Sequence, residues 1–234
     1  MNKIKIVIFF NVFLFVINVF AQDVHYSLYQ ETKSYFNPAF VAHQNMASSL
    51  QVQYRTQWMA IPDAYQTYSI NYTRNNPNNS IAWGLMAYQH QAGDASIKST
   101  GLSFNMAYNF TIDQDNLAIG VAIGSLNKHF NPNTFTFDSQ YNELTGFDET
   151  IASGEVFAQT NRSRADLGLG VHWQSQFDWF TEVKTNVGFA LAHIQQPKES
   201  FYNDFFKIPI KKVLQAELAF DVYPDICLIP HILW

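Results

Sequence analysis

Apolar side chains recur at every second position along most of this chain. In the clearest run, every second residue from Leu102 to Phe110 is large and apolar, and the residues between them are Ser, Asn or Ala. Side chains two residues apart lie on the same face of a β-strand, so this alternation predicts strands with one apolar and one polar face. A chain built mainly from such runs is expected to be all-β.

Runs of this kind predict about nine antiparallel strands and no helix. They extend over residues 50–57, 68–73, 81–87, 102–110, 117–124, 166–173, 187–192, 214–222 and 226–234. Pro230 interrupts the last run, because proline lacks the N–H group that a paired strand donates.

The links between the runs alternate in length. Short links with turn-forming residues occupy 75–79, 113–116, 174–178 and 224–225, and longer links occupy 59–64, 89–96, 126–160 and 195–209. Successive links of an antiparallel meander lie at opposite ends of the sheet. Short turns at one end and long loops at the other are typical of outer-membrane β-barrels, whose short turns face the periplasm.

The polar face of the predicted strands carries few charges. Charged residues make up 14% of the chain, against about 25% in an ordinary soluble protein. The polar positions are mainly Gln, Asn, Ser, Gly and Ala. The sequence therefore favours an antiparallel transmembrane outer-membrane β-barrel with its apolar face toward lipid; the alternative is a secreted lipocalin-like barrel or β-sandwich. Aromatic residues near the ends of the runs would form the girdles at the membrane surfaces, namely Trp58, Tyr65, Tyr72, Tyr108, Phe110, Trp173 and Tyr223.

Three parts are expected along the chain. Residues 1–21 have the pattern of a signal peptide, in which Lys3 and Lys5 precede an apolar stretch that ends at Ala21. Residues 22–47 would be a periplasmic N-terminal segment, and residues 48–234 would form the strands of the barrel. Bacterial single-chain barrels have an even number of strands. Nine strands therefore predict an incomplete, C-terminally truncated barrel that needs further strands or a partner chain.

Charge and residue spacing argue against several functions. The net charge of -5 argues against a nucleic-acid partner, which requires a basic surface. The single cysteine, Cys227, excludes a disulfide framework and a multi-cysteine metal site. The seven histidines lack metal-binding spacing, and only His25-Tyr26-Ser27 places a serine two residues after a histidine. We therefore expect no enzymatic activity, no cofactor and no metal.

Several short blocks follow one another in a recognisable order. They are Asn37-Pro38-Ala39, Arg55-Thr56-Gln57-Trp58, Gln91-Ala92-Gly93, Asp138-Ser139-Gln140, Gly146-Phe147-Asp148, Gly154-Glu155 and Gln196-Pro197. Each block alone is weak, but the ordered set resembles the PorP/SprF family of type IX secretion system membrane proteins. The resemblance covers essentially the whole mature chain, and family members usually continue for several more strands.

The resemblance implies a non-enzymatic component in the outer membrane of a Gram-negative bacterium. Such a protein would bind secreted proteins or adhesins, or support their export and surface attachment, in a gliding-type machinery. The expected partners are the C-terminal region of a secreted protein or adhesin, other type IX secretion components on the periplasmic side, and outer-membrane lipid. The alternative is a passive outer-membrane channel for small solutes.

Two further features allow two interpretations each. Residues 126–160 form a long link that is rich in aromatic and acidic residues; it would either dock a partner or fold back into the lumen. Five glycines fall on the polar side of neighbouring strands, where they would either keep the wall clear for another polypeptide or relieve curvature in the sheet. They are Gly120, Gly124, Gly168, Gly170 and Gly188.

Overall fold

The computed structural model describes residues 24, 26–43, 47–60, 64–75, 80–92, 97–142, 146–178, 182–202, 206–223 and 226–234. Most of these residues belong to antiparallel strands. The long strands are β1 (Ser48–Gln57), β2 (Tyr65–Asn75), β3 (Ile81–Ala92), β4 (Ile97–Ile112), β5 (Asp115–His129), β8 (Asn161–Asp178), β9 (Glu182–Ala192) and β10 (Lys211–Tyr223). The short strands are β6 (Tyr141–Asn142), β7 (Gly146–Phe147), β11 (Ile226–Leu228) and β12 (His231–Leu233). The helical turns are α2 (Lys33–Phe36), η1 (Pro38–Ala42), η2 (Pro132–Thr134) and η3 (Asp138–Gln140).

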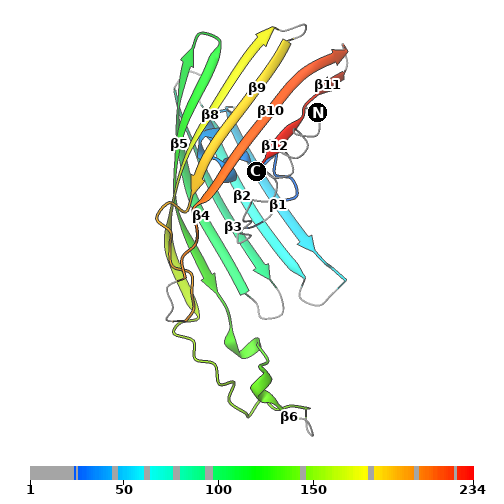
Figure 1. Cartoon of the computed structure of the whole chain (residues 1–234), viewed down its shortest axis with the longest axis vertical. Helices are drawn as coiled ribbons and strands as arrows, with labels where there is room; N and C mark the ends of the chain where they lie inside the picture. Colours follow the sequence, from blue (N-terminus) through cyan, green and yellow to red (C-terminus); the bar gives the residue numbers. More distant parts are fainter. Residues whose placement is uncertain are drawn as a thin grey trace, which may run out of the picture.

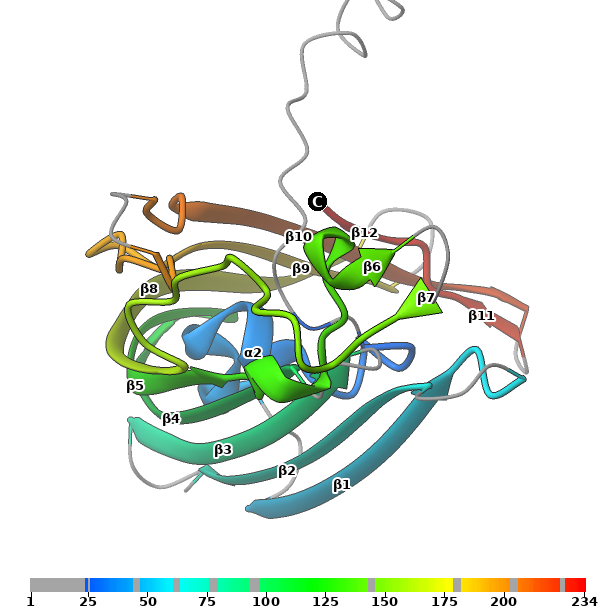
Figure 2. The same cartoon turned by 90° about the horizontal axis from the view of Figure 1, so that it is seen from below.

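The main sheet is an antiparallel meander of 10 strands in the order β1-β2-β3-β4-β5-β8-β9-β10-β11, and β12 also pairs with β10. Figures 1 and 2 show that the sheet curves around a concave inner face. The sheet is not closed, because β1 pairs only with β2 among the described residues. The predicted all-β, antiparallel architecture is confirmed, and the open sheet has the curvature of a barrel wall.

The nine predicted runs correspond to the strands of this sheet. Eight of them lie in the long strands, and the ninth is divided into β11 and β12, which pair with β10 on either side of Ile229 and Pro230. Several strands are longer than the apolar alternation indicates. The β8 strand, for example, continues through Gln174 and Gln176 to Asp178, so residues 174–178 are not the predicted turn.

The two faces of the sheet differ as the alternation predicts. On β4, Phe104 is exposed on the outer face, whereas Asn105 is buried on the inner face. Tyr108, Phe110 and Trp173 of the expected girdle are also exposed on the outer face. The assignment of Tyr65 to this girdle is wrong. Tyr65 shares the inner face with Thr67, and its ring centroid lies 6.2 Å from that of His90.

Residues 26–43, which we call the inner segment, lie in the concavity of the sheet (Figure 2). The inner segment contains α2 and η1, although no helix was expected from the sequence. Three of its residues, Ala39, Val41 and Ala42, form an apolar core with three small strand residues, Ala82, Ala107 and Ala118. Within the N-terminal part expected at residues 22–47, the described residues 26–43 are therefore packed against the strands, and the periplasmic location of this part stays a prediction.

The expected signal peptide, residues 1–21, lies outside the described residues. Within the described ranges, the structure contains no helix that is long and apolar enough to cross a membrane.

Candidate functional site

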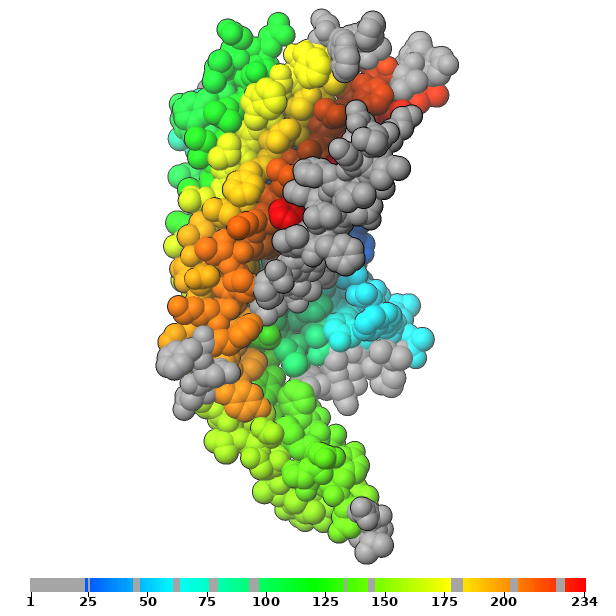
Figure 3. All heavy atoms as spheres, viewed as in Figure 1, coloured from blue at the N-terminus to red at the C-terminus, as the bar shows by residue number. Residues whose placement is uncertain are grey.

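Two long connections meet at one end of the sheet. Residues 130–160 connect β5 to β8, and residues 193–210 connect β9 to β10. Figures 1 and 3 show the first connection as a lobe that extends beyond the strands. We call residues 130–160 the projection and residues 193–202 the bracing segment. The projection does not fold back into the concavity (Figure 1), so the interpretation that it fills the lumen is wrong, and the docking interpretation stays a prediction.

Side-chain and backbone hydrogen bonds give the projection its own fold. The short strands β6 and β7 form a two-stranded sheet, and Gly146, the first residue of β7, has a φ of 76°, which favours glycine. Gln140 links both sides of this unit. The side-chain Nε2 of Gln140 donates to the backbone carbonyl oxygen of Ile151 at 3.0 Å, and the backbone carbonyl oxygen of Gln140 accepts from Asp148 N at 2.9 Å.

An aromatic cluster joins the projection to the bracing segment. Phe130, only 3% exposed, has its ring centroid 4.4 Å from that of Phe201 and 4.9 Å from that of Phe157. The Tyr202 hydroxyl donates to a carboxylate oxygen of Glu155 at 3.1 Å. Edge-to-face aromatic pairs at such distances stabilise a fold beyond the area they bury. The two connections therefore form one structural unit.

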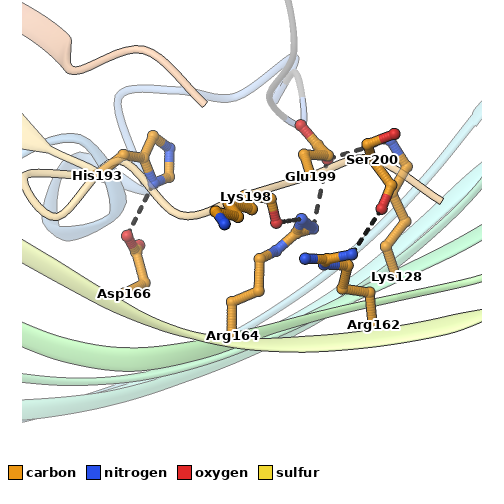
Figure 4. Close-up of polar contacts among 8 residues, drawn as sticks. All are labelled: Lys128, Arg162, Arg164, Asp166, His193, Lys198, Glu199 and Ser200. Carbon is orange, nitrogen blue, oxygen red and sulfur yellow. Dashed lines mark hydrogen bonds and ion pairs between the residues drawn. The ribbon is translucent and has the colours of Figure 1, made fainter. Parts of the chain in front are cut away.

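An ionic cluster on the inner face holds the bracing segment to the strands (Figure 4). The Glu199 carboxylate accepts from Lys128 of β5 at 3.1 Å and from Arg164 of β8 at 3.4 Å. Arg164 Nη1 also donates to the Lys198 carbonyl oxygen at 2.9 Å, and Arg162 Nη1 donates to the Ser200 carbonyl oxygen at 2.8 Å. The Arg164 side chain is 7% exposed. A cation buried to this extent requires such partners.

The start of the bracing segment is fixed by a second set of contacts. His193 Nδ1 and an Asp166 carboxylate oxygen lie 2.8 Å apart (Figure 4). The Gln195 side chain accepts from Leu167 N at 3.0 Å. His193 and Gln196 adopt positive φ angles of 57° and 47°, which reverse the chain direction after β9. These contacts turn the bracing segment back over β8.

The projection presents apolar and acidic side chains to solvent. Its sequence contains five acidic residues and no Lys, Arg or His. Tyr141, Phe147 and Val156 are exposed. Thr150 donates two hydrogen bonds to Asp148, from Oγ1 at 2.7 Å and from N at 2.9 Å. These bonds lower the pKa of the Asp148 carboxyl group, which therefore stays ionised at neutral pH.

Comparison with protein families identifies the chain. The family model described as type IX secretion system membrane protein PorP/SprF matches residues 18–234. The chain belongs to this family. As a PorP/SprF protein, it is a membrane component of the type IX secretion system, and membership implies that it works with other components of that system. Comparisons with curated proteins and with solved structures gave no match.

The blocks that carry the PorP/SprF resemblance fall in two places. Most lie at the end of the sheet that carries the projection, and Asn37, Pro38 and Ala39 lie in the inner segment. The first group contains Arg55 and Gln57 of β1, Trp58 after it, Gln91 and Ala92 of β3, the projection residues Asp138, Gly146, Phe147, Asp148, Gly154 and Glu155, and Gln196 and Pro197 of the bracing segment. Gly93 lies outside the described residues. The first group therefore shares one end of the molecule.

Sequence reasoning did not find the ionic cluster. Lys128, Arg162 and Arg164 lie on the inner face of β5 and β8, where almost every other inward position is small or uncharged. Basic residues on such a face are a signal that an acidic partner lies nearby. Nothing in the alternation indicates that this partner is Glu199, because the contact depends on how the bracing segment folds.

Proposed function

We propose that this PorP/SprF protein is a non-enzymatic outer-membrane component that binds secreted proteins at the cell surface. The long connections would face outside, and the short turns would face the periplasm and other type IX secretion components. The bound partner would be the C-terminal region of a secreted protein or adhesin, and binding would support export or surface attachment in a gliding-type machinery. Outer-membrane lipid would cover the apolar outer face of the sheet.

The projection is the observation that supports this proposal. It is folded, is joined to the bracing segment by the aromatic cluster, and exposes Tyr141, Phe147 and Val156 beyond the strands. Exposed aromatic side chains on a pre-ordered loop are typical anchors of protein interfaces. Its acidic residues would select a partner surface with basic groups.

The alternative of a passive channel for small solutes is less well supported. The inner segment lies in the concavity that such a channel would need to keep open (Figure 2). Conductance measured in planar bilayers, with and without a secreted partner, distinguishes a permanently open channel from a binding component.

The proposal is tested by co-purification from native membranes. A tagged protein carrying Tyr141→Ser and Phe147→Ser should recover about tenfold less secreted partner than the unchanged protein, because both anchors are lost. Met59→Ser is the matched control, since Met59 is an exposed apolar residue in a different connection at the same end of the sheet. Equal recovery with the Tyr141/Phe147 variant and the control would contradict the proposal.

A further inference from the structure

The inner segment is attached to strands on opposite sides of the concavity. On one side, Asn71 Nδ2 of β2 donates to Ser34 Oγ at 3.1 Å. On the other side, Lys33 Nζ and the Glu217 carboxylate of β10 form an ion pair at 2.8 Å. The Tyr29 hydroxyl is also hydrogen-bonded to His231 of β12. The segment therefore extends across the inner face from β2 to the opposite edge of the sheet.

Asn37 anchors the middle of the inner segment. Its side chain is fully buried. The Oδ1 atom accepts from Ala39 N at 3.0 Å and so caps the first turn of η1, and Nδ2 donates to the Val171 carbonyl oxygen of β8 at 3.1 Å. One side chain thus fixes the local turn and joins it to the wall. This gives Asn37 and the following Pro38 a structural role that their sequence pattern does not show.

Three wall glycines allow the inner segment to approach this closely. A Cβ atom at Gly120 of β5 would overlap the backbone of Pro38 and Ala39, and one at Gly170 of β8 would overlap Asn37 Oδ1. A Cβ at Gly188 of β9 would lie 2.8 Å from Asn37 Nδ2. Added atoms in such packed contacts force the two parts to separate.

Gly124 and Gly168 differ from the other three glycines. An added Cβ at Gly168 would lie 3.2 Å from the Leu191 carbonyl oxygen, and one at Gly124 would lie 2.5 Å from the Leu102 carbonyl oxygen. These neighbours belong to the adjacent strands, not to the inner segment. Of the five glycines, only Gly120, Gly170 and Gly188 therefore keep the wall clear for another stretch of polypeptide, and relief of curvature at Gly124 and Gly168 stays a prediction.

We infer that the inner segment is a plug that seals the lumen, and that Gly120, Gly170 and Gly188 form its seat. Two cavities beside the segment have volumes of only about 30 and 70 Å³. Spaces of this size hold a few water molecules. Sealing depends on the segment staying in contact with its seat.

The first test adds one methyl group to the seat. In a Cys227→Ser background, Ser34→Cys reports on docking, because Ser34 belongs to the inner segment and is buried where the segment contacts Asn71 of β2. We expect a water-soluble maleimide to label this cysteine at least about tenfold more slowly than an exposed Ser139→Cys. Adding Gly120→Ala should raise the labelling of Ser34→Cys about tenfold and make cells more permeable to a large antibiotic.

Gly168→Ala is the matched control, because Gly168 also faces inward on a strand paired with β5 and its Cβ would not meet the inner segment. It should change neither labelling nor permeability, and heat-modifiable gel mobility shows whether both variants fold. Equal effects of Gly120→Ala and Gly168→Ala would contradict the assignment of Gly120 to the seat.

A second test leaves the glycines unchanged. Cysteines at Ser34 and Asn71 should be joined by a short bifunctional thiol reagent, since the side chains of Ser34 and Asn71 are in contact. If this cross-link does not form, and Ser34→Cys is labelled rapidly in the protein with unchanged glycines, the inference that the inner segment is a plug is wrong.

Discussion

At the residue scale, neighbouring positions on one strand meet different surroundings. Phe104 of β4 is 41% exposed and Leu218 of β10 is 42% exposed, and both lie on the outer face. We propose that this face contacts lipid. Phe104→Arg or Leu218→Arg should therefore lower the free energy of unfolding by roughly 2–4 kcal/mol, as measured by denaturant titration in detergent or lipid.

The choice of an inward-facing control residue for this prediction depends on which inner-face positions lie beside the inner segment. From the sequence alone, Arg in place of the inward-facing Asn105 is expected to cost much less than at Phe104. The structure contradicts this choice, because Asn105 is buried and borders a cavity beside the inner segment. Gln53 of β1 is half-buried on the inner face and is the better control. A loss at Gln53→Arg as large as at Phe104→Arg would contradict the assignment of the two faces.

His43 gives docking of the inner segment a pH dependence. Its ring centroid lies 3.9 Å from that of His172 of β8, and burial lowers the pKa of His43 from 6.5 to about 4. The undocked segment binds a proton more readily, so docking is favoured above pH 6.5 and weakens as the pH falls toward 4. Between pH 7 and pH 5, docking should weaken by about 1–2 kcal/mol.

This pH effect is measured as labelling of Ser34→Cys at both pH values, divided by that of the exposed Ser139→Cys to correct for thiol ionisation. The ratio should rise at pH 5. An unchanged ratio would contradict the half-buried placement of His43 against His172.

At the scale of elements, the ionic cluster sets the position of the bracing segment. Glu199→Gln removes the charge that pairs with Lys128 and Arg164 and leaves the mostly buried Arg164 guanidinium without its carboxylate. We expect a local loss of roughly 2–4 kcal/mol in the stability of this segment. Faster hydrogen exchange at the amides of residues 199–202 would show it.

Asp113→Asn provides the control for Glu199→Gln. Asp113 is an exposed carboxylate in the turn between β4 and β5, at the opposite end of the sheet. This change should leave exchange in the bracing segment unaltered. If Glu199→Gln also leaves that exchange unaltered, the ion pairs do not hold the segment.

The strands could be predicted from sequence because alternation is a local property. Leu102 to Phe110 specifies both a strand and its two faces without information from the rest of the chain. The contacts of Glu199 and Asn37 could not be predicted in this way. Glu199 meets Arg164 across 35 residues, and Asn37 meets Val171 across 134 residues. The first contact depends on how the bracing segment folds, and the second on how the inner segment packs against β8.

At the scale of the whole molecule, the outer face exposes apolar side chains. The concave inner face holds the inner segment, and the two ends of the sheet are unlike (Figure 1). One end carries the projection and the bracing segment, and the other carries short connections such as the turn at Asp113. For a membrane-spanning wall, these two ends lie on opposite sides of the bilayer. The proposed recognition of secreted proteins requires the projection to be outside the cell.

Labelling on intact cells tests this arrangement most directly. Single cysteines are placed at Ser139 in the projection and at Gln114 in the turn between β4 and β5, both in a Cys227→Ser background. Both positions are exposed, so access depends on the side of the membrane. A membrane-impermeant maleimide should label Ser139→Cys on intact cells and Gln114→Cys only after permeabilisation. Labelling of Gln114→Cys but not Ser139→Cys on intact cells would contradict the orientation and the proposed role of the projection.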